Sequence, residues 1–224
     1  MTPELIVMLT NNDVTVPNAA EVFESCKDLP NRKWGFKDVG LPKEEMTALA
    51  KAMKEAGKET FIEVVTYTEA GCLEGAKMAV DCGFDYLTGT IPFPLVFAFA
   101  KEYGLKYFPF CGKVGGSPVT LTGTMEEIVA SAKSCIDQGA SGVDLTSYRY
   151  TDGDPVELTK AVVEAVGGDR VCIAGSIGNT KRMDAMKEAG VAEYTMGSAL
   201  FNANFVKDGT FRENLEFVLD YLKK

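Results

Sequence analysis

Eight short apolar segments alternate with longer helical patterns along the 224 residues of the chain, and this alternation constrains the fold more than any other feature. The apolar segments are rich in β-branched and aromatic residues, which favours strands. They cover residues 5–10, 33–38, 60–66, 86–90, 106–111, 142–148, 170–176 and 194–198. A first helix is expected directly after Asn18. Further helical patterns cover residues 43–56, 69–81, 94–103, 125–138, 155–166, 180–189 and 211–224.

Turn and cap residues punctuate these patterns. Thr124 and Glu127 form a capping-box pattern, and Pro155 suits a first helical turn. Glycines that suit the left-handed position after a helix stand at Gly57, Gly83, Gly104, Gly139, Gly167 and Gly190. Eight strand–helix units predict an α/β fold, a (β/α)8 TIM barrel that forms a single domain over residues 1–224. A doubly wound open sheet is the alternative, although it usually has five or six strands.

Composition excludes several classes of function. The chain has no histidine, which removes Ser-His-Asp triads and imidazole metal sites, so no metal centre of that kind is expected. The net charge of −9 argues against nucleic-acid binding. The longest apolar stretch, residues 91–100, contains two prolines and is too short to span a membrane. Six cysteines without a CxxC motif, and a start without signal-peptide character, predict a cytoplasmic protein.

Two Gly-Ser pairs indicate a phosphate site. They end the strand-like segments IAGSI (residues 173–177) and TMGSALF (residues 195–201), and each precedes a helix start. Neighbouring strands that end in this way can direct several backbone N–H groups at one anion, as in the phosphate sites of barrels. We therefore expect Gly175, Ser176, Gly197 and Ser198 to bind the phosphate of a small phosphorylated metabolite.

Charged residues inside predicted strands are the candidates for chemistry, since an unpaired charge there is costly. Lys37 ends the second strand, Glu63 lies in the third and Asp144 in the sixth. We predict that they form a catalytic lysine–carboxylate cluster that moves a proton next to a carbonyl or imine. The alternative is a buried structural network, such as a Lys37–Glu63 ion pair.

Polar residues at the expected strand ends are the candidates for substrate binding. They are Asn11, Asp38, Thr88, Lys113, Thr146 and Arg149. Asp13 is an alternative to Asn11 in the first loop, where Asn and Asp also simply favour turns. Arg149 can bind an anion through two donors. Residues 114–123 form the longest non-helical connection, and their glycines suit a lid over the substrate.

The chain resembles the ribulose-phosphate-binding barrels. The stretch from residue 139 to 205 is similar to the isomerase and cyclase barrels of histidine biosynthesis, through LTSYRYTDG (residues 145–153), IAGSI and MGSALF. The resemblance implies a barrel whose Gly175, Ser176, Gly197 and Ser198 contact phosphate. Those enzymes use an Asp at the ends of strands 1 and 5, whereas the predicted strands end here in Thr10 and Cys111. We therefore adopt the barrel and the phosphate site, and not the histidine-pathway activity.

The sequence thus predicts an isomerase, epimerase or decarboxylase that acts on a small monophosphorylated sugar-like carbonyl compound and requires no cofactor. One alternative is a carbon–carbon lyase that uses Lys37 as an imine former, or Mg²⁺ held by Asp38, Glu63 and Asp144. The other is a phosphometabolite-binding barrel without catalysis. The sequence leaves the oligomeric state open, and a homo-oligomer is among the states that it allows.

Overall fold

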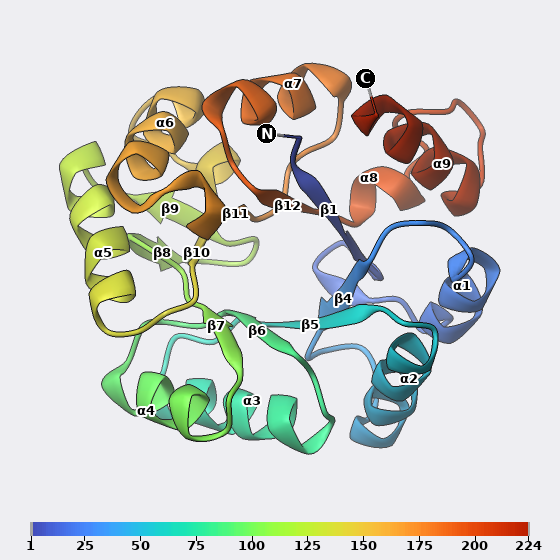
Figure 1. Cartoon of the computed structure of the whole chain (residues 1–224), viewed down its shortest axis with the longest axis horizontal. Helices are drawn as coiled ribbons and strands as arrows, with labels where there is room; N and C mark the ends of the chain where they lie inside the picture. Colours follow the sequence, from blue (N-terminus) through green and yellow to red (C-terminus); the bar gives the residue numbers. More distant parts are fainter. Residues whose placement is uncertain (1, 224) are drawn as a thin grey trace.

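A computed structural model describes residues 2–223, and its centre is an eight-stranded parallel sheet curled into a barrel (Figure 1). The strands run in the order β10-β11-β12-β1-β4-β5-β6-β7. They are β1 (Glu4–Met8), β4 (Lys33–Lys37), β5 (Glu59–Val64), β6 (Tyr86–Gly89), β7 (Lys106–Phe108), β10 (Val143–Leu145), β11 (Val171–Ile173) and β12 (Glu193–Met196). The Asp144 amide donates to the Pro109 carbonyl (2.8 Å), which joins the ends of the row. The predicted (β/α)8 barrel is confirmed.

Helices surround the barrel and cover its outer surface (Figure 1). They are α1 (Ala19–Cys26), α2 (Lys43–Glu55), α3 (Glu69–Asp81), α4 (Pro94–Glu102), α5 (Met125–Asp137), α6 (Pro155–Val166), α7 (Thr180–Ala189), α8 (Ser198–Phe201) and α9 (Phe211–Leu222). The six predicted helix-ending glycines all have positive φ, as a left-handed ending requires. Thr124 and Glu127 form the predicted capping box, whereas Asn18 precedes α1 without a side-chain cap.

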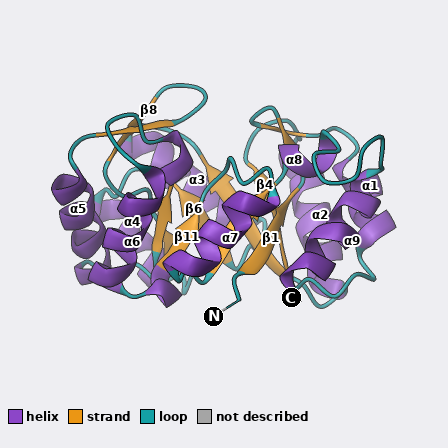
Figure 2. Ribbon diagram, turned by 90° about the horizontal axis from the view of Figure 1, so that it is seen from above, coloured by secondary structure: helices purple, strands orange, loops and turns teal. Residues whose placement is uncertain are grey.

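Two hairpins extend the carboxyl-terminal end of the barrel, and neither was predicted. One consists of β2 (Thr10–Asn11) and β3 (Val14–Thr15), the other of β8 (Lys113–Gly115) and β9 (Thr120–Thr122). In side view, β8 lies at the opposite edge of the molecule from both termini (Figure 2). The expected lid over residues 114–123 is therefore largely a hairpin. Most predicted strands end a few residues early. In the first, Thr10 enters the β2–β3 hairpin, and after β10 the residues Ser147–Arg149 form a 3₁₀ turn (η1).

The barrel interior is filled in layers. Its middle holds a compact apolar cluster that consists of Ile6, Met8, Phe61, Tyr86, Phe108 and Cys172. The rings of Phe61 and Tyr86 stack with their centroids 3.9 Å apart. A larger apolar cluster fills the space between the strands and the helices. The interior is a packed core, so a ligand has room only at its ends.

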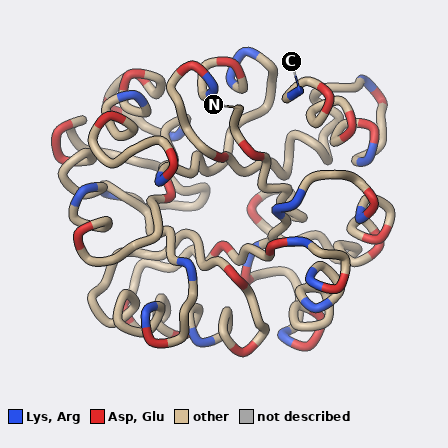
Figure 3. The backbone as a smooth tube through the Cα atoms, viewed as in Figure 1, with Lys and Arg blue, Asp and Glu red and all other residues tan. Residues whose placement is uncertain are grey.

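Charged residues are spread over the outer helices, and a smaller number lie on the strands around the barrel axis (Figure 3). The strand residues gather at the two ends of the barrel, above and below the apolar cluster. Among residues 2–223, no helix combines the length and the apolar composition that crossing a bilayer requires.

Candidate active site

A pocket of about 340 Å³ lies at the carboxyl-terminal end of the strands, and we call it the mouth pocket. It brings together eight of the predicted site residues: Lys37, Glu63, Thr146, Arg149, Gly175, Ser176, Gly197 and Ser198. Its lining comes mainly from β1, β4, β5 and β12 and from the segments that follow β10 and β11, so residues far apart in the sequence meet there. This is the end of a barrel where substrates bind.

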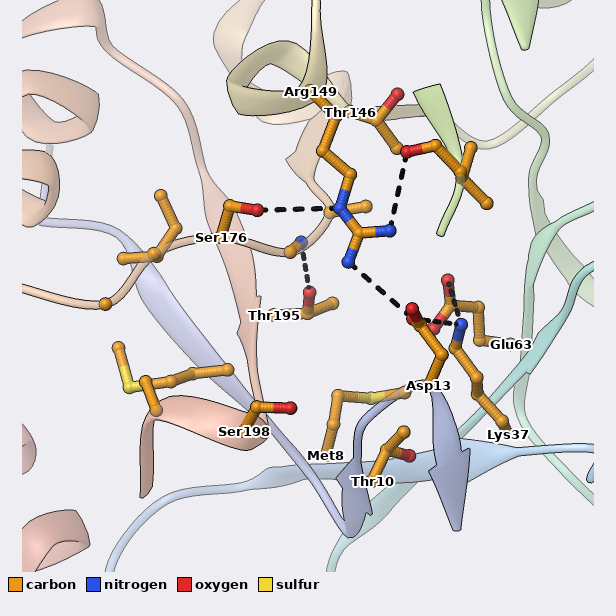
Figure 4. A pocket seen from close by; sticks show the side chains of 18 of the residues that line it. Met8, Thr10, Asp13, Lys37, Glu63, Thr146, Arg149, Ser176, Thr195 and Ser198 are labelled. Atoms are coloured by element: carbon orange, nitrogen blue, oxygen red, sulfur yellow. Dashed lines mark hydrogen bonds and ion pairs between the residues drawn. The ribbon is translucent and has the colours of Figure 1, made fainter. Parts of the chain in front are cut away.

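Lys37 is the centre of an ion cluster on one side of the mouth pocket (Figure 4). Its Nζ lies 2.9 Å from Asp13 Oδ1 and 3.8 Å from Glu63 Oε1. Lys37 and Glu63 are register partners on the paired strands β4 and β5. The Lys37 side chain is only 7% exposed, and that of Glu63 is 15% exposed. We refer to Lys37, Asp13 and Glu63 as the Lys37 cluster.

The Lys37 cluster separates the pKa values of its members. Burial alone would lower the pKa of Lys37, but the charges of Glu63 and Asp13 outweigh burial and raise it. Burial raises the pKa of Glu63, against the opposing effect of Lys37. The pKa of Asp13 is lowered, because its hydrogen bond and charge interaction with Lys37 outweigh its partial burial. The cluster therefore holds a protonated amine beside a carboxyl group whose pKa is raised by burial.

The β2–β3 hairpin explains how Asp13 reaches Lys37. Asn12 and Asp13 both have positive φ, the geometry that two-residue hairpin loops favour. Thr15 then fixes the hairpin to β4, because its Oγ1 donates to the Lys37 carbonyl (2.8 Å) and accepts from the Lys37 amide (3.0 Å). The turn thereby directs the Asp13 carboxylate to the lysine.

The two Gly-Ser pairs also line the mouth pocket, and Ser176 and Ser198 lie across it from the Lys37 cluster (Figure 4). The Gly175 amide already donates to Thr195 Oγ1 (2.9 Å), and a Cβ on Gly175 would meet the Arg149 guanidinium. A Cβ on Gly197 would lie 2.5 Å from the Thr10 carbonyl oxygen. Close packing therefore favours glycine at both positions, independently of any bound phosphate. The first amides of α8, at Ser198 and Ala199, precede the first intrahelical donor, Leu200.

Two arginines flank Ser176, whose φ is +62°. Arg149 Nε lies 3.5 Å from Ser176 Oγ, and its NH2 lies 3.6 Å from Asp13 Oδ1. Arg182 donates to the Ser176 carbonyl and stacks on the Tyr148 ring, 4.4 Å from its centroid. Both guanidinium groups line the mouth pocket.

Five predicted site residues lie outside the lining of the mouth pocket: Asn11, Asp38, Thr88, Lys113 and Asp144. Asp144 is 1% exposed, and its Oδ2 accepts from the Gly89 amide (3.1 Å). Burial, and next the nearby Glu63 carboxyl, raise the pKa of Asp144 well above its usual range. Asp144 can therefore influence Glu63, but it does not face the space where a ligand fits.

The other four outlying residues have different surroundings. Burial raises the pKa of Asp38 to about 6. Thr88 is buried in β6, and its hydroxyl lies 3.4 Å from the Ile62 carbonyl. Asn11 belongs to the β2–β3 hairpin, and Lys113 is exposed in the β8–β9 hairpin. The structure does not bring these four to the pocket that holds Lys37 and Glu63.

Asp13, the alternative to Asn11 in the first loop, lines the pocket in place of Asn11. Several other lining residues were not among the predicted contacts: Thr10, Arg182, Thr195, Asn202 and Asn204. The sequence does contain a signal for Arg182. It stands in the first turn of α7, next to Lys181 and without an acidic neighbour, where the helix dipole disfavours cations. Arg182 stands six residues after Ser176, the serine of the first Gly-Ser pair.

The carboxylates expected to hold Mg²⁺ do not form a ligand set. Within residues 2–223, no three cysteine, aspartate or glutamate side chains gather closely enough to hold a metal ion. The proposed trio of Asp38, Glu63 and Asp144 is therefore not assembled as that alternative expected.

Comparisons with known proteins extend the description of the fold. No family model matches the chain, and no curated protein matches it. The native structure of KDPGal aligns with 100% of this chain and 98% of its own, at 15% identity and a TM-score of 0.67. The tryptophan synthase A-subunit from Pyrococcus furiosus aligns over 99% and 96%, at 13% identity and a TM-score of 0.65. The N-acetylmannosamine-6-phosphate 2-epimerase from Clostridium perfringens aligns over 88% and 86%, at 11% identity and a TM-score of 0.64. At these identities the similarity shows the barrel fold alone.

Proposed function

We propose that the protein is an enzyme that moves a proton next to the carbonyl group of a small monophosphorylated, sugar-like compound, as an isomerase, epimerase or decarboxylase. One observation supports this most strongly. The Lys37 cluster and the two Gly-Ser strand ends face each other across one pocket (Figure 4). A ligand held by its phosphate at the serines would extend its other end toward Lys37.

The roles follow from the protonation states. The Lys37 ammonium would donate a hydrogen bond to the substrate carbonyl oxygen and stabilise the negative charge that develops there. The Glu63 carboxylate would accept the proton from the adjacent carbon and return it to the neighbouring position. Asp13 keeps Lys37 charged and in place, at 2.9 Å. The chain's own side chains suffice for this chemistry, and it requires no cofactor.

The lyase alternative requires a Lys37 amine without its proton. An imine-forming lysine must lose its proton before it attacks a carbonyl, and enzymes favour this by lowering the pKa of that lysine. The pKa of Lys37 is instead raised by two carboxylates. This difference favours proton transfer over imine formation. Borohydride trapping with ligand present tests the choice, because only the imine route leaves a covalent adduct on Lys37.

The sequence resemblance to ribulose-phosphate-binding barrels supports the same proposal, through the Gly-Ser pairs that line the mouth pocket. The epimerase with a similar fold is named for a phosphorylated sugar. A cytoplasmic location and a homo-oligomeric state remain expectations from the sequence. A phosphometabolite-binding barrel without catalysis is the competing function.

Deuterium exchange separates these possibilities. The protein is incubated in D₂O with a panel of phosphorylated aldoses, ketoses and N-acetylated sugars, and proton NMR follows the C–H groups next to each carbonyl. The proposal predicts loss of such a signal, and much slower loss with Lys37→Met and Glu63→Gln. Lys51→Met is the matched control, since Lys51 is exposed on α2. A ligand that binds tightly without exchange or conversion would support the binding barrel instead.

A further inference from the structure

The two arginines of the mouth pocket are placed by different elements on either side of one residue. Arg149 ends the 3₁₀ turn η1 and faces the Ser176 hydroxyl, whereas Arg182 belongs to the first turn of α7 and faces the Ser176 carbonyl. Like charges that share a pocket repel each other, and the repulsion is relieved when an anion lies between them.

The interactions of the arginines within the protein leave donors free. Arg149 has contacts of 3.5 Å with Ser176 Oγ, 3.5 Å with the Val119 carbonyl and 3.6 Å with Asp13 Oδ1. These distances exceed those of ordinary charge-assisted hydrogen bonds, which are about 2.7–2.9 Å. Arg182 makes no ion pair anywhere in the described residues 2–223. Guanidinium groups with free donors suit a phosphate, which they can bind through two parallel hydrogen bonds.

The charges in the mouth pocket point to the same ligand. The lining holds three cations, Lys37, Arg149 and Arg182, and two carboxylates. Lys37 is engaged by both carboxylates, at 2.9 and 3.8 Å. The lining therefore keeps a net charge of +1 in a protein whose net charge is −9, and Arg182 has no carboxylate partner within residues 2–223. A phosphate monoester carries close to two negative charges at neutral pH, and its oxygens can accept from both guanidinium groups.

The pocket lining also contains polar groups without partners in the described part of the chain. The hydroxyls of Thr146 and Thr10 are buried in the pocket lining, and each lacks a hydrogen-bond partner within residues 2–223. In contrast, the Gly175 amide, which the sequence pattern offers to phosphate, is occupied by Thr195. The backbone contribution is thus smaller than the Gly-Ser pattern predicts, and side chains must supply more of the binding.

We propose that Arg149 and Arg182 form a two-arginine clamp over Ser176, and that this clamp selects a phosphate monoester dianion over monoanionic groups. The inference deepens the proposed function, on whose phosphate handle it rests. Tyr148 is the positioning residue, because its ring supports the Arg182 guanidinium at 4.4 Å.

Calorimetric titration of the intact protein with inorganic phosphate and with glycerol 3-phosphate tests the clamp without any need for turnover. Loss of one charge-assisted contact weakens binding by about 10-fold or more, so Arg149→Gln and Arg182→Gln should each show this effect. Lys181→Gln is the matched control, since it removes the same charge from an exposed neighbour on α7. Dimethyl phosphate, a monoanion, should bind wild type much more weakly than glycerol 3-phosphate.

Three variants separate binding from structure. Arg182→Lys keeps the charge and loses the planar fork, so we expect a partial loss of affinity. Tyr148→Phe keeps the ring and should bind as wild type does, whereas Tyr148→Ala should weaken binding a few-fold.

Unchanged affinity in Arg182→Gln, an equal loss in Lys181→Gln, or no phosphate binding by wild type would each overturn the clamp. Failure of the proposed function gives a different result, namely intact, arginine-dependent phosphate binding without deuterium exchange on any compound of the panel.

Discussion

Ionised side chains occupy both ends of the barrel interior, and at the amino-terminal end they satisfy one another. Lys33 pairs with Glu193 and lies 2.6 Å from Glu4. Glu59 pairs with Arg32 and accepts from the Tyr86 hydroxyl (2.7 Å). The resulting network closes the bottom of the barrel.

At the carboxyl-terminal end, charged and polar side chains have hydrogen-bond donors and acceptors without close partners among residues 2–223. Lys37 is paired, but Arg149 has only contacts of 3.5 Å and longer. The buried hydroxyls of Thr10 and Thr146, in the mouth-pocket lining, find no hydrogen-bond partner within residues 2–223. Buried polar groups without partners are rare in folded proteins and indicate a strained or ligand-binding region. A charge inside a barrel is therefore weak evidence for chemistry, whereas unused hydrogen-bonding capacity beside a pocket is stronger evidence.

Removing one lysine from each end of the barrel gives the largest expected difference between the two ends. Lys37→Met should reduce turnover or exchange by at least about 100-fold, since it removes the group that stabilises the developing charge. Lys33→Met should keep the rate. It should instead lose about 3 kcal/mol of unfolding free energy, because Glu193 stays buried without its partner. Chemical denaturation and NMR exchange measure both quantities, and equal rate losses in the two variants would remove the distinction between the ends.

The glutamates offer a second contrast, with a pH signature. Burial raises the pKa of Glu63, and a base must be deprotonated to act, so activity should rise with pH through that raised pKa. Glu63→Gln should lower kcat by about 100-fold or more and abolish this rise. Glu193→Gln at the other end should retain both the rate and the pH profile. A pH profile that is unaltered in Glu63→Gln would assign the base to another residue.

Asp144 provides a smaller effect on stability. Its pKa in the folded protein is raised by burial above an unfolded value near 3.9. Ionisation of Asp144 therefore costs stability as the pH rises above about 4 and through the raised pKa. Asp144→Asn is neutral and can still accept from Gly89. It should be more stable than wild type at pH 8 and equally stable at pH 3.5, with each kcal/mol seen as about 2–4 °C in melting temperature.

The control for that experiment is Asp137→Asn, which alters an exposed carboxylate on α5. A gain in melting temperature that is the same at both pH values, or no gain at all, would contradict a buried, unfavourable charge at Asp144.

Lys113 gives the smallest expected effect. It is exposed in the β8–β9 hairpin and lies outside the mouth-pocket lining. Lys113→Met should change kcat and KM by less than about twofold, because screened surface charges contribute little at a distance. A KM increase of 10-fold would show that the hairpin closes over the substrate and brings Lys113 into the site.

Much of the fold could be predicted because its signals are local. The glycines that follow six of the helical patterns, and the β-branched or aromatic residues of the strands, act through neighbouring residues only. The charged strand residues Lys37 and Glu63 were found for a similar reason, since one strand position fixes the direction of one side chain.

The missing parts depend on how the chain folds back in space. Asp13 reaches Lys37 only through the unpredicted β2–β3 hairpin, and the Gly175 amide is occupied by a threonine from the next strand. Asp144 was correctly predicted to lie in a strand. Whether its carboxyl group reaches the mouth pocket depends on how the side chains of the barrel interior pack, including the apolar cluster of Ile6 and its neighbours. Such features are settled by packing between distant segments, which periodicity does not encode.

A crystal structure with glycerol 3-phosphate tests most directly the claim that the two ends differ. We expect a phosphate at Ser176 and Ser198, with the rest of the ligand directed toward Lys37. A second basic pocket lies at the amino-terminal end, lined by Arg32, Lys54, Lys58 and Lys106. A phosphate found there, with the mouth pocket empty, would contradict the account.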